Sequence, residues 1–107
     1  MFYQQGDVKI HPVGSIVNGE KVIFPESPKK LDHLTLAVGE ATGHHHTITD
    51  GEAVLYEENG VLYLHVEKES TLTHQEHAPI VLPKGDYKIK IVKEYDHFLE
   101  ESRNVAD

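Results

Sequence analysis

The sequence predicts an all-β fold, built as a small barrel or sandwich in a single domain. Apolar residues come in short runs with a period of two, which is the pattern of half-buried strands. Turn-forming residues separate these runs at intervals of about 8–12 residues, as they do in sandwiches and small barrels. No segment carries the 3.6-residue apolar period of an amphipathic helix.

The expected strands follow from this alternation in chain order. In residues 7–13, Val8 and Ile10 share one face while polar side chains occupy the other. Residues 33–38 alternate in the same way, with Leu34, Leu36 and Val38 on one face. The clearest element is residues 53–67, where two alternating runs meet at Asn59-Gly60, a dipeptide typical of two-residue hairpin turns. A last strand is expected within residues 85–95.

Turns and the chain end complete the expected organisation. Further turns are predicted at Asn18-Gly19, residues 25–28, Asp50-Gly51 and residues 83–85. Residues 96–107 are expected to form a tail or a short extra element, so that residues 1–107 make one domain. A chain of 107 residues has a small core, which favours a homo-oligomer such as a dimer.

The composition of the chain limits the kinds of ligand and partner that we expect it to bind. The formal net charge is −8, with 10 basic and 18 acidic residues, which speaks against binding to duplex nucleic acid. Cysteine is absent, so disulfides and thiolate ligands are excluded. No apolar run approaches the ~20 residues that cross a bilayer, so no membrane contact is expected. No secretory leader opens the sequence, which favours a cytoplasmic location.

Histidines concentrate in two places, and these carry the functional prediction. In the segment "GHHHTIT", a strand would project His44 and His46 to one face and His45 to the other. Two imidazoles spaced in this way are close enough to bind one ion. Gly43 lets the backbone turn sharply just before them.

The second group is "HQEHAP", in which two residues separate His74 from His77. A regular strand would send these side chains to opposite faces, so they converge only if the chain bends. Pro79 favours such a bend because it disfavours helix before it and donates no sheet hydrogen bond. Together, His44, His46, His74 and His77 are the predicted ligands of a divalent transition metal: zinc, nickel, iron or manganese.

Two carboxylates accompany these ligands along the chain. Glu40 precedes the first histidine group and Glu76 lies within the second, so each is a candidate for proton transfer. The remaining histidines are interpreted as surface or structural residues: His11, His33, His45, His65 and His97.

The order of Gly39, His44, His46, Glu52 and Gly60 resembles the first motif of the cupin superfamily, each spacing differing by about one residue. The second cupin motif is matched only at Pro83 and Gly85, because Lys88 stands at its histidine position. The resemblance spans residues 34–92 and implies a jelly roll with a metal near the barrel mouth, with Glu52 as a glutamate ligand. It implies no particular reaction.

A second resemblance covers the histidine segments themselves. The chain is similar to small bacterial and phage proteins that pair a G-H-x-H segment with an H-x-x-H-x-P segment. That similarity supports the four-histidine ligand set and implies no activity.

Three functions remain open on these grounds. The first is a cupin-like metalloenzyme or metal-binding protein that acts on a small molecule, with the ion as Lewis acid or water activator. The second is metal-free acid–base cleavage of a phosphodiester by His44 and His74, with Lys84 or Lys88 as the anion contact. The third is a non-enzymatic β module that binds a partner through an edge strand.

Overall fold

The computed structural model describes residues 2–39 and 42–92. In this part of the chain every helix-or-strand element is a strand, so the all-β prediction is confirmed. No helix in the same residues is long and apolar enough to cross a membrane. The expected tail at residues 96–107 lies outside the described residues. The strands are β1 (Tyr3–Gln5), β2 (Val8–Pro12), β3 (Ile16–Val17), β4 (Glu20–Lys21), β5 (Lys29–Lys30), β6 (Thr35–Val38), β7 (His45–Glu58), β8 (Val61–Thr73), β9 (Ile80–Leu82) and β10 (Gly85–Ile91).

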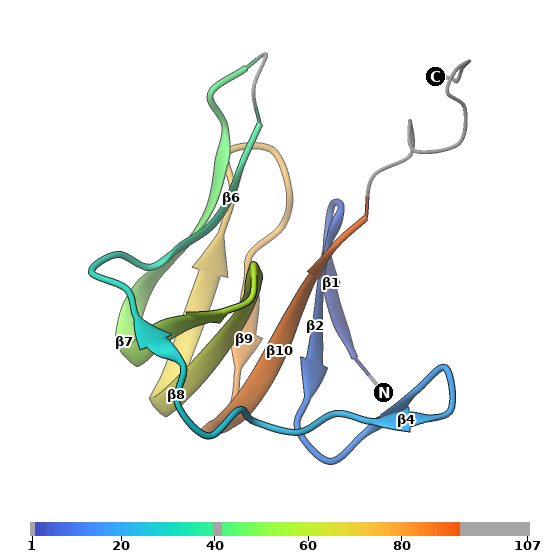
Figure 1. Ribbon diagram of the computed structural model, residues 1–107. Coiled ribbons are helices and arrows are strands. Elements are labelled where there is room, and N and C mark those ends of the chain that lie inside the picture. The colour runs from blue at the N-terminus through green and yellow to red at the C-terminus, as the bar shows by residue number, and fades with distance from the viewer. Residues whose placement is uncertain (1, 40–41, 93–107) are drawn as a thin grey trace.

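Eight of these strands form one antiparallel sheet in the order β1-β2-β10-β8-β7-β5, with β6 paired to β7 and β9 paired to β8. The strands β3 and β4 form a separate arm beside it (Figure 1). Among the described strands, β1 and β5 end the path without pairing to each other, so the sheet does not close into a barrel. The folded-over sheet is consistent with the sandwich form of the prediction.

The long hairpin of β7 and β8 is the centre of the fold, and it forms where the sequence predicts it. Glu58 pairs with Val61 across Asn59-Gly60. These two turn residues have φ values of 53° and 79°, as a type I′ turn requires. Asn18-Gly19 repeats the same geometry between β3 and β4, so the hairpin predicted at Asn59-Gly60 and the turn predicted at Asn18-Gly19 are both confirmed.

The turn predicted at Asp50-Gly51 is wrong, because both residues lie inside β7. The β7–β8 register instead shifts around them, and Gly51 has a φ of 84° that L side chains rarely adopt. The Asp50 Oδ1 atom accepts a hydrogen bond of 2.8 Å from the Thr71 N–H. This bulge bends the hairpin, so that one half of β8 pairs with β10 and the other half with β9.

The core lies on the inner face of the bent sheet. The alternation in β2, β8 and β10 is confirmed, because it buries Val8 and Ile10, Leu64 and Val66, and Tyr87 and Ile89. A fully buried aliphatic side chain contributes about 2 kcal/mol to the free energy of unfolding. Val38 departs from its predicted face and is 62% exposed, because the β6–β7 register shifts between Thr35 and Ala37. The core is completed by Leu36, Ile48, Leu55, Leu72 and Leu82.

Three segments that are distant in the sequence meet at one end of the sheet. They are the β1–β2 turn, the start of β7 and the loop between β8 and β9, all at the upper end in Figure 1. The two histidine groups lie on the second and third of these segments.

Candidate functional site

All four predicted ligand histidines line one depression of ≈ 690 Å³ at this end of the sheet. The His46 and His74 ring centroids are 4.3 Å apart, and those of His74 and His77 are 4.6 Å apart. The ring of His44 lies 5.6 Å from that of His74. The two histidine groups, nearly thirty residues apart in the sequence, therefore share one surface.

The start of β7 positions the first pair of histidines, His44 and His46. His46 is 5% exposed, and His44, two residues before it, lines the same depression. His45 does not line the depression, and its N–H donates a 2.9 Å hydrogen bond to Gln75 Oε1. The alternation predicted from the sequence thus places the two outer histidines of the triplet together.

A tight bend after β8 positions the second pair, His74 and His77. The sequence predicted this bend, because two residues separate the two histidines and a regular strand would send them to opposite faces. The strand ends at Thr73, and the His74 Nδ1 atom accepts hydrogen bonds from the N–H groups of Glu76 (3.0 Å) and His77 (3.3 Å). The imidazole thereby closes the turn that brings its partner histidine back to the same side.

Gln5 fixes the tautomer of His46. The Gln5 amide nitrogen donates to the carbonyls of Leu72 (3.0 Å) and Ala78 (2.9 Å), so its Oε1 atom is the acceptor. That oxygen lies 2.8 Å from His46 Nδ1, which therefore carries the proton. In the neutral ring the His46 Nε2 atom then has a free lone pair, the arrangement typical of a metal-binding histidine.

His74 has the opposite tautomer. Because its Nδ1 atom accepts two backbone hydrogen bonds, the proton of the neutral ring lies on Nε2. The four rings also pack against one another, with His46 and His77 nearly parallel at 14°. Within residues 2–39 and 42–92, no three His, Asp or Glu side chains are arranged to hold one ion.

The depression favours neutral imidazoles. Burial, followed by the neighbouring His74, lowers the pKa of His46 below its ordinary value of 6.5, although Asp7 opposes the shift. The pKa of His74 is also lowered, first by desolvation and then by His77 and His44. Since burial and neighbouring imidazoles both disfavour the charged form, these two rings are neutral at pH 7.

The carboxylates at the site differ from the predicted pair. Glu76 lines the depression, with its Oε2 atom 3.8 Å from His44 Nδ1, and its side chain is 71% exposed. Glu40 lies outside the described residues. Asp7, which was not predicted from the sequence, has its Oδ1 atom 3.6 Å from His46 Nε2.

Other predicted contacts lie elsewhere in the structure. Glu52, the glutamate ligand implied by the cupin resemblance, instead forms a 3.5 Å ion pair with Lys68. It does not line the histidine depression, and neither of the lysines suggested as phosphate contacts, Lys84 and Lys88, lines it. The cupin resemblance itself stays a prediction.

A family model described as a domain of unknown function (DUF8820) matches residues 4–92. The chain belongs to the DUF8820 family. No curated protein and no solved structure matches the chain. All four histidines and Glu76 fall within the DUF8820 region, so the candidate site belongs to the family domain and not to an appended segment.

Three residues near the beginning of the DUF8820 region complete the site, and sequence reasoning missed them. Gln5 and Asp7 flank Gly6, which forms the β1–β2 turn with a φ of 60°. A Cβ atom at Gly6 would lie 2.7 Å from His77 Nε2, so the turn packs directly on that ring. In the sequence, the Gly-Asp dipeptide before an alternating strand does predict a turn at this position. It does not indicate which distant residues the turn contacts.

Proposed function

We propose that this domain binds a divalent transition metal ion through its histidine cluster and presents it to a small molecule. The observation that carries the proposal is the convergence of His44, His46, His74 and His77 on one depression. Nitrogen ligands of this kind suit zinc, nickel, iron or manganese. Bound there, the ion would act as a Lewis acid or lower the pKa of a water molecule.

His46 is the anchor of the proposed site. A neutral ring with Nδ1–H donated to a fixed amide oxygen offers its Nε2 lone pair without rearrangement. The lowered pKa keeps this ring deprotonated at pH 7, which a ligand requires. Asp7, 3.6 Å from the same nitrogen, would add an oxygen ligand or accept a proton, and Glu76 would serve the second role beside His44.

His74 must change its hydrogen bonds and its tautomer before it can bind the metal ion. Its Nδ1 lone pair is used by two backbone N–H groups, so its Nε2 atom becomes a ligand only when those bonds break and the ring proton moves to Nδ1. We therefore expect the first ligands to be His46, His44 and His77, with the loop that carries His74 and His77 rearranging on binding.

Isothermal titration calorimetry and metal analysis of the untagged protein test this proposal, using Zn²⁺, Ni²⁺, Co²⁺ and Mn²⁺ separately. One ion per chain is expected, and Co²⁺ should report its ligand geometry by visible absorption. Replacing His46 by Gln should weaken binding at least about tenfold, as loss of a metal ligand or of its supporting hydrogen bond does.

The matched control is His45→Gln, which removes the adjacent imidazole that does not line the depression. It should leave the affinity unchanged. Substoichiometric metal that chelators do not remove, or equal losses in both variants, would contradict the proposed site.

A second candidate, metal-free acid–base catalysis, is favoured by one observation. His46 presents a lone pair at Nε2 and His74 a proton at Nε2, so the neighbouring rings have the complementary forms of a base and an acid. The absence of Lys84 and Lys88 from the depression counts against a phosphodiester substrate. Turnover of bis(p-nitrophenyl) phosphate that survives EDTA would favour this candidate over the metal site.

A further inference from the structure

A basic cluster lies on the outer face of the sheet, away from the histidine depression. In the antiparallel pairing of β2 with β10, His11 is opposite Lys88 and Lys9 is opposite Lys90. The intervening residues Ile10 and Ile89 point into the core. Because side chains alternate along a strand, these four basic residues share the outer face on neighbouring strands about 5 Å apart.

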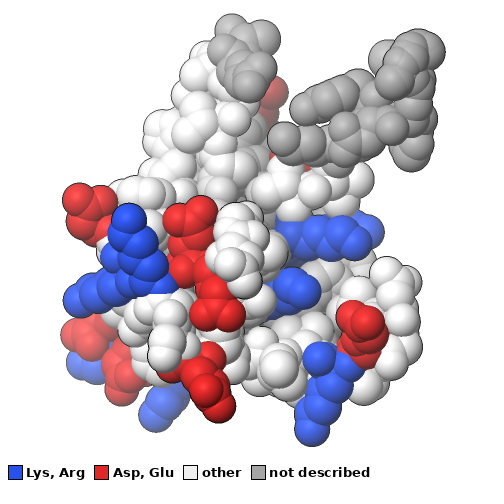
Figure 2. Space-filling view, viewed as in Figure 1, with Lys and Arg blue, Asp and Glu red and all other residues white. Residues whose placement is uncertain are grey.

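The β3–β4 arm turns this cluster into a groove. Its cavity volume is ≈ 790 Å³, and it is lined by Lys88, Lys90 and His11 from the sheet and by Val17 and Val22 from the arm. Tyr63 forms part of the wall on the sheet side. Figure 2 shows basic side chains over β10 beside this arm. We call this feature the basic groove; among the described residues, Ile91 alone lines both the basic groove and the histidine depression.

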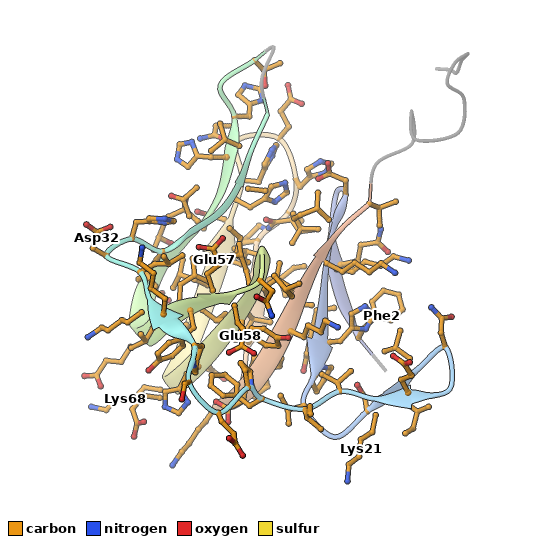
Figure 3. All side chains as sticks on the ribbon, viewed as in Figure 1. Phe2, Lys21, Asp32, Glu57, Glu58 and Lys68 are labelled. Carbon is orange, nitrogen blue, oxygen red and sulfur yellow. The ribbon has the colours of Figure 1, made fainter. Side chains whose placement is uncertain are left out.

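In the part of the chain that the structure describes, the lysines in and beside the groove form no salt bridge with a carboxylate. Among the salt bridges of the described residues, none involves Lys9, Lys88 or Lys90. The Lys9 Nζ atom lies 5.2 Å from the ring centroid of Phe2, which stands beside β2 in Figure 3. Adjacent ammonium groups repel one another, so a bound anion would lower the electrostatic energy of this face.

The carboxylates of Glu20 and Asp86 lie close to this basic face and would disfavour the binding of an anion. Glu20 on the arm is the one acidic residue among the described residues that line the groove. Asp86 shares the outer face of β10 with Lys88, but its Oδ1 atom is 2.5 Å from His65 Nδ1 and is engaged there. Positive charge therefore outweighs negative charge at the groove, although the whole chain carries a net charge of −8.

His11 supplies the second, independent observation. Its side chain lines the groove and is 7% exposed, and its Nε2 atom is buried without a hydrogen-bond partner in the described residues. A buried polar atom without a hydrogen-bond partner is destabilising, so proteins rarely leave one unless something else binds there. Burial, then Lys9, Lys90 and Lys88, lowers the pKa of His11, because desolvation and neighbouring ammonium groups both disfavour the charged imidazole.

We propose that the basic groove binds a small organic phosphate, with the phosphate held by Lys88, Lys90 and His11. Ammonium groups and an imidazole N–H are donors that phosphate oxygens accept. The apolar part of the ligand would lie against Val17, Val22 and Tyr63, which line the rest of the groove. This site does not depend on the proposed metal site.

Nuclear magnetic resonance titration of the full-length untagged protein tests the proposal, with inorganic phosphate and phenyl phosphate as separate probes. The buffer should hold about 10 mM chloride, because the Debye length is then about 30 Å. Saturable shifts are expected at the Lys88 and Lys90 amides and at the His11 ring. Phenyl phosphate should bind more tightly than inorganic phosphate because it also covers the apolar wall.

The double substitution Lys88→Gln with Lys90→Gln should weaken phenyl phosphate binding at least about tenfold, since charge-assisted hydrogen bonds are lost. The matched control is Lys29→Gln with Lys30→Gln, which makes the same change of charge on exposed β5 and should bind as the parent does. His11→Phe should weaken binding while keeping the ring contact with Phe2. His46→Gln, which disrupts the metal site, should bind phenyl phosphate normally.

Two results would overturn the proposal. One is a linear, non-saturating response that chloride and sulfate reproduce, which would mean only nonspecific ion contact. The other is equal weakening in the two double-lysine variants, which would mean that net charge alone governs the response.

Discussion

The side chains of Gln5 and His46 form a buried hydrogen bond between residues 41 positions apart in the chain. The same amide also donates to carbonyls at the end of β8 and in the loop after it. One glutamine thus joins the three segments that meet at the histidine depression. Its geometry determines which nitrogen of His46 is available to a ligand.

Replacing Gln5 by Ala should lower both stability and metal affinity. Three hydrogen bonds are lost, two of them buried and one part-buried, and their partners are left unsatisfied, so the free energy of unfolding should fall by at least about 2 kcal/mol. Metal affinity should fall roughly tenfold because His46 loses its supporting acceptor. Urea denaturation and calorimetry measure these effects. Gln4→Ala, which removes an exposed bond to Gly6, is the control and should change stability by less than about 0.5 kcal/mol.

Gly6→Ala should disturb the histidine cluster specifically. The new methyl group would lie 2.7 Å from His77 Nε2, so the ring must move away from the depression. The control Gly43→Ala has a similar positive φ, 75° against 60°, but open space around it. Both should cost about 1 kcal/mol in backbone strain, whereas only Gly6→Ala should shift the His77 imidazole resonances and weaken metal binding. Identical spectra for the His77 ring in the two variants would contradict this account.

The bulge in β7 gives a comparable test of the fold. Ala at Gly51 would meet Ser70 and the Glu69 carbonyl, with the Ser70 Cα atom 2.8 Å away, whereas Ala at Gly60 would meet nothing within 4 Å. Their φ values are similar, 84° and 79°. Gly60→Ala should therefore cost about 1 kcal/mol, and Gly51→Ala about 1–3 kcal/mol more because backbone atoms must move. Thermal and urea denaturation would reveal the difference, and equal losses would argue against the close approach.

The features that were predicted correctly, the turns and the bend, depend on residues that are neighbours in the sequence. Asn59-Gly60 and Asn18-Gly19 adopt positive φ values that few residue pairs tolerate, so their turns are readable without knowledge of the partner strands. The bend at His74–His77 was likewise signalled by spacing and by Pro79. The short strands β1 and β9 were missed, because three residues carry too little periodicity to distinguish a strand from a loop.

The features that could not be predicted from the sequence depend on strand register and on contacts between distant segments. Asp50-Gly51 has the composition of a turn, and only its pairing opposite Thr71 makes it a bulge within a continuous strand. Gln5 and Asp7 join the site because β1 and β2 pass beside the start of β7, which no local pattern encodes. The tautomer of His74 depends on backbone N–H groups in its own bend, and so on a conformation more than on residue type.

His65 on the outer face lies between two carboxylates. Its Nδ1 atom is 2.5 Å from Asp86 Oδ1, and its Nε2 atom is 2.9 Å from Glu67 Oε1. The hydrogen bond to Asp86, then that to Glu67, raises the pKa of His65 above its ordinary value of 6.5. A pKa that is higher in the folded state means that the folded protein binds the proton more tightly than the unfolded chain.

The contribution of His65 to stability should therefore be fully present below about pH 6.5 and decline as the pH rises through the folded pKa. Asp86→Asn removes the main partner, so it should destabilise the protein more at about pH 6 than at about pH 8.5. The difference should be on the order of 0.5 kcal/mol, because water screens a pair that is about one-third exposed. Urea denaturation at both pH values measures it, with Glu69→Gln on the exposed side of β8 as the control. A larger effect of Asp86→Asn at the higher pH would contradict the assignment, because a neutral imidazole gains nothing from the carboxylate charge.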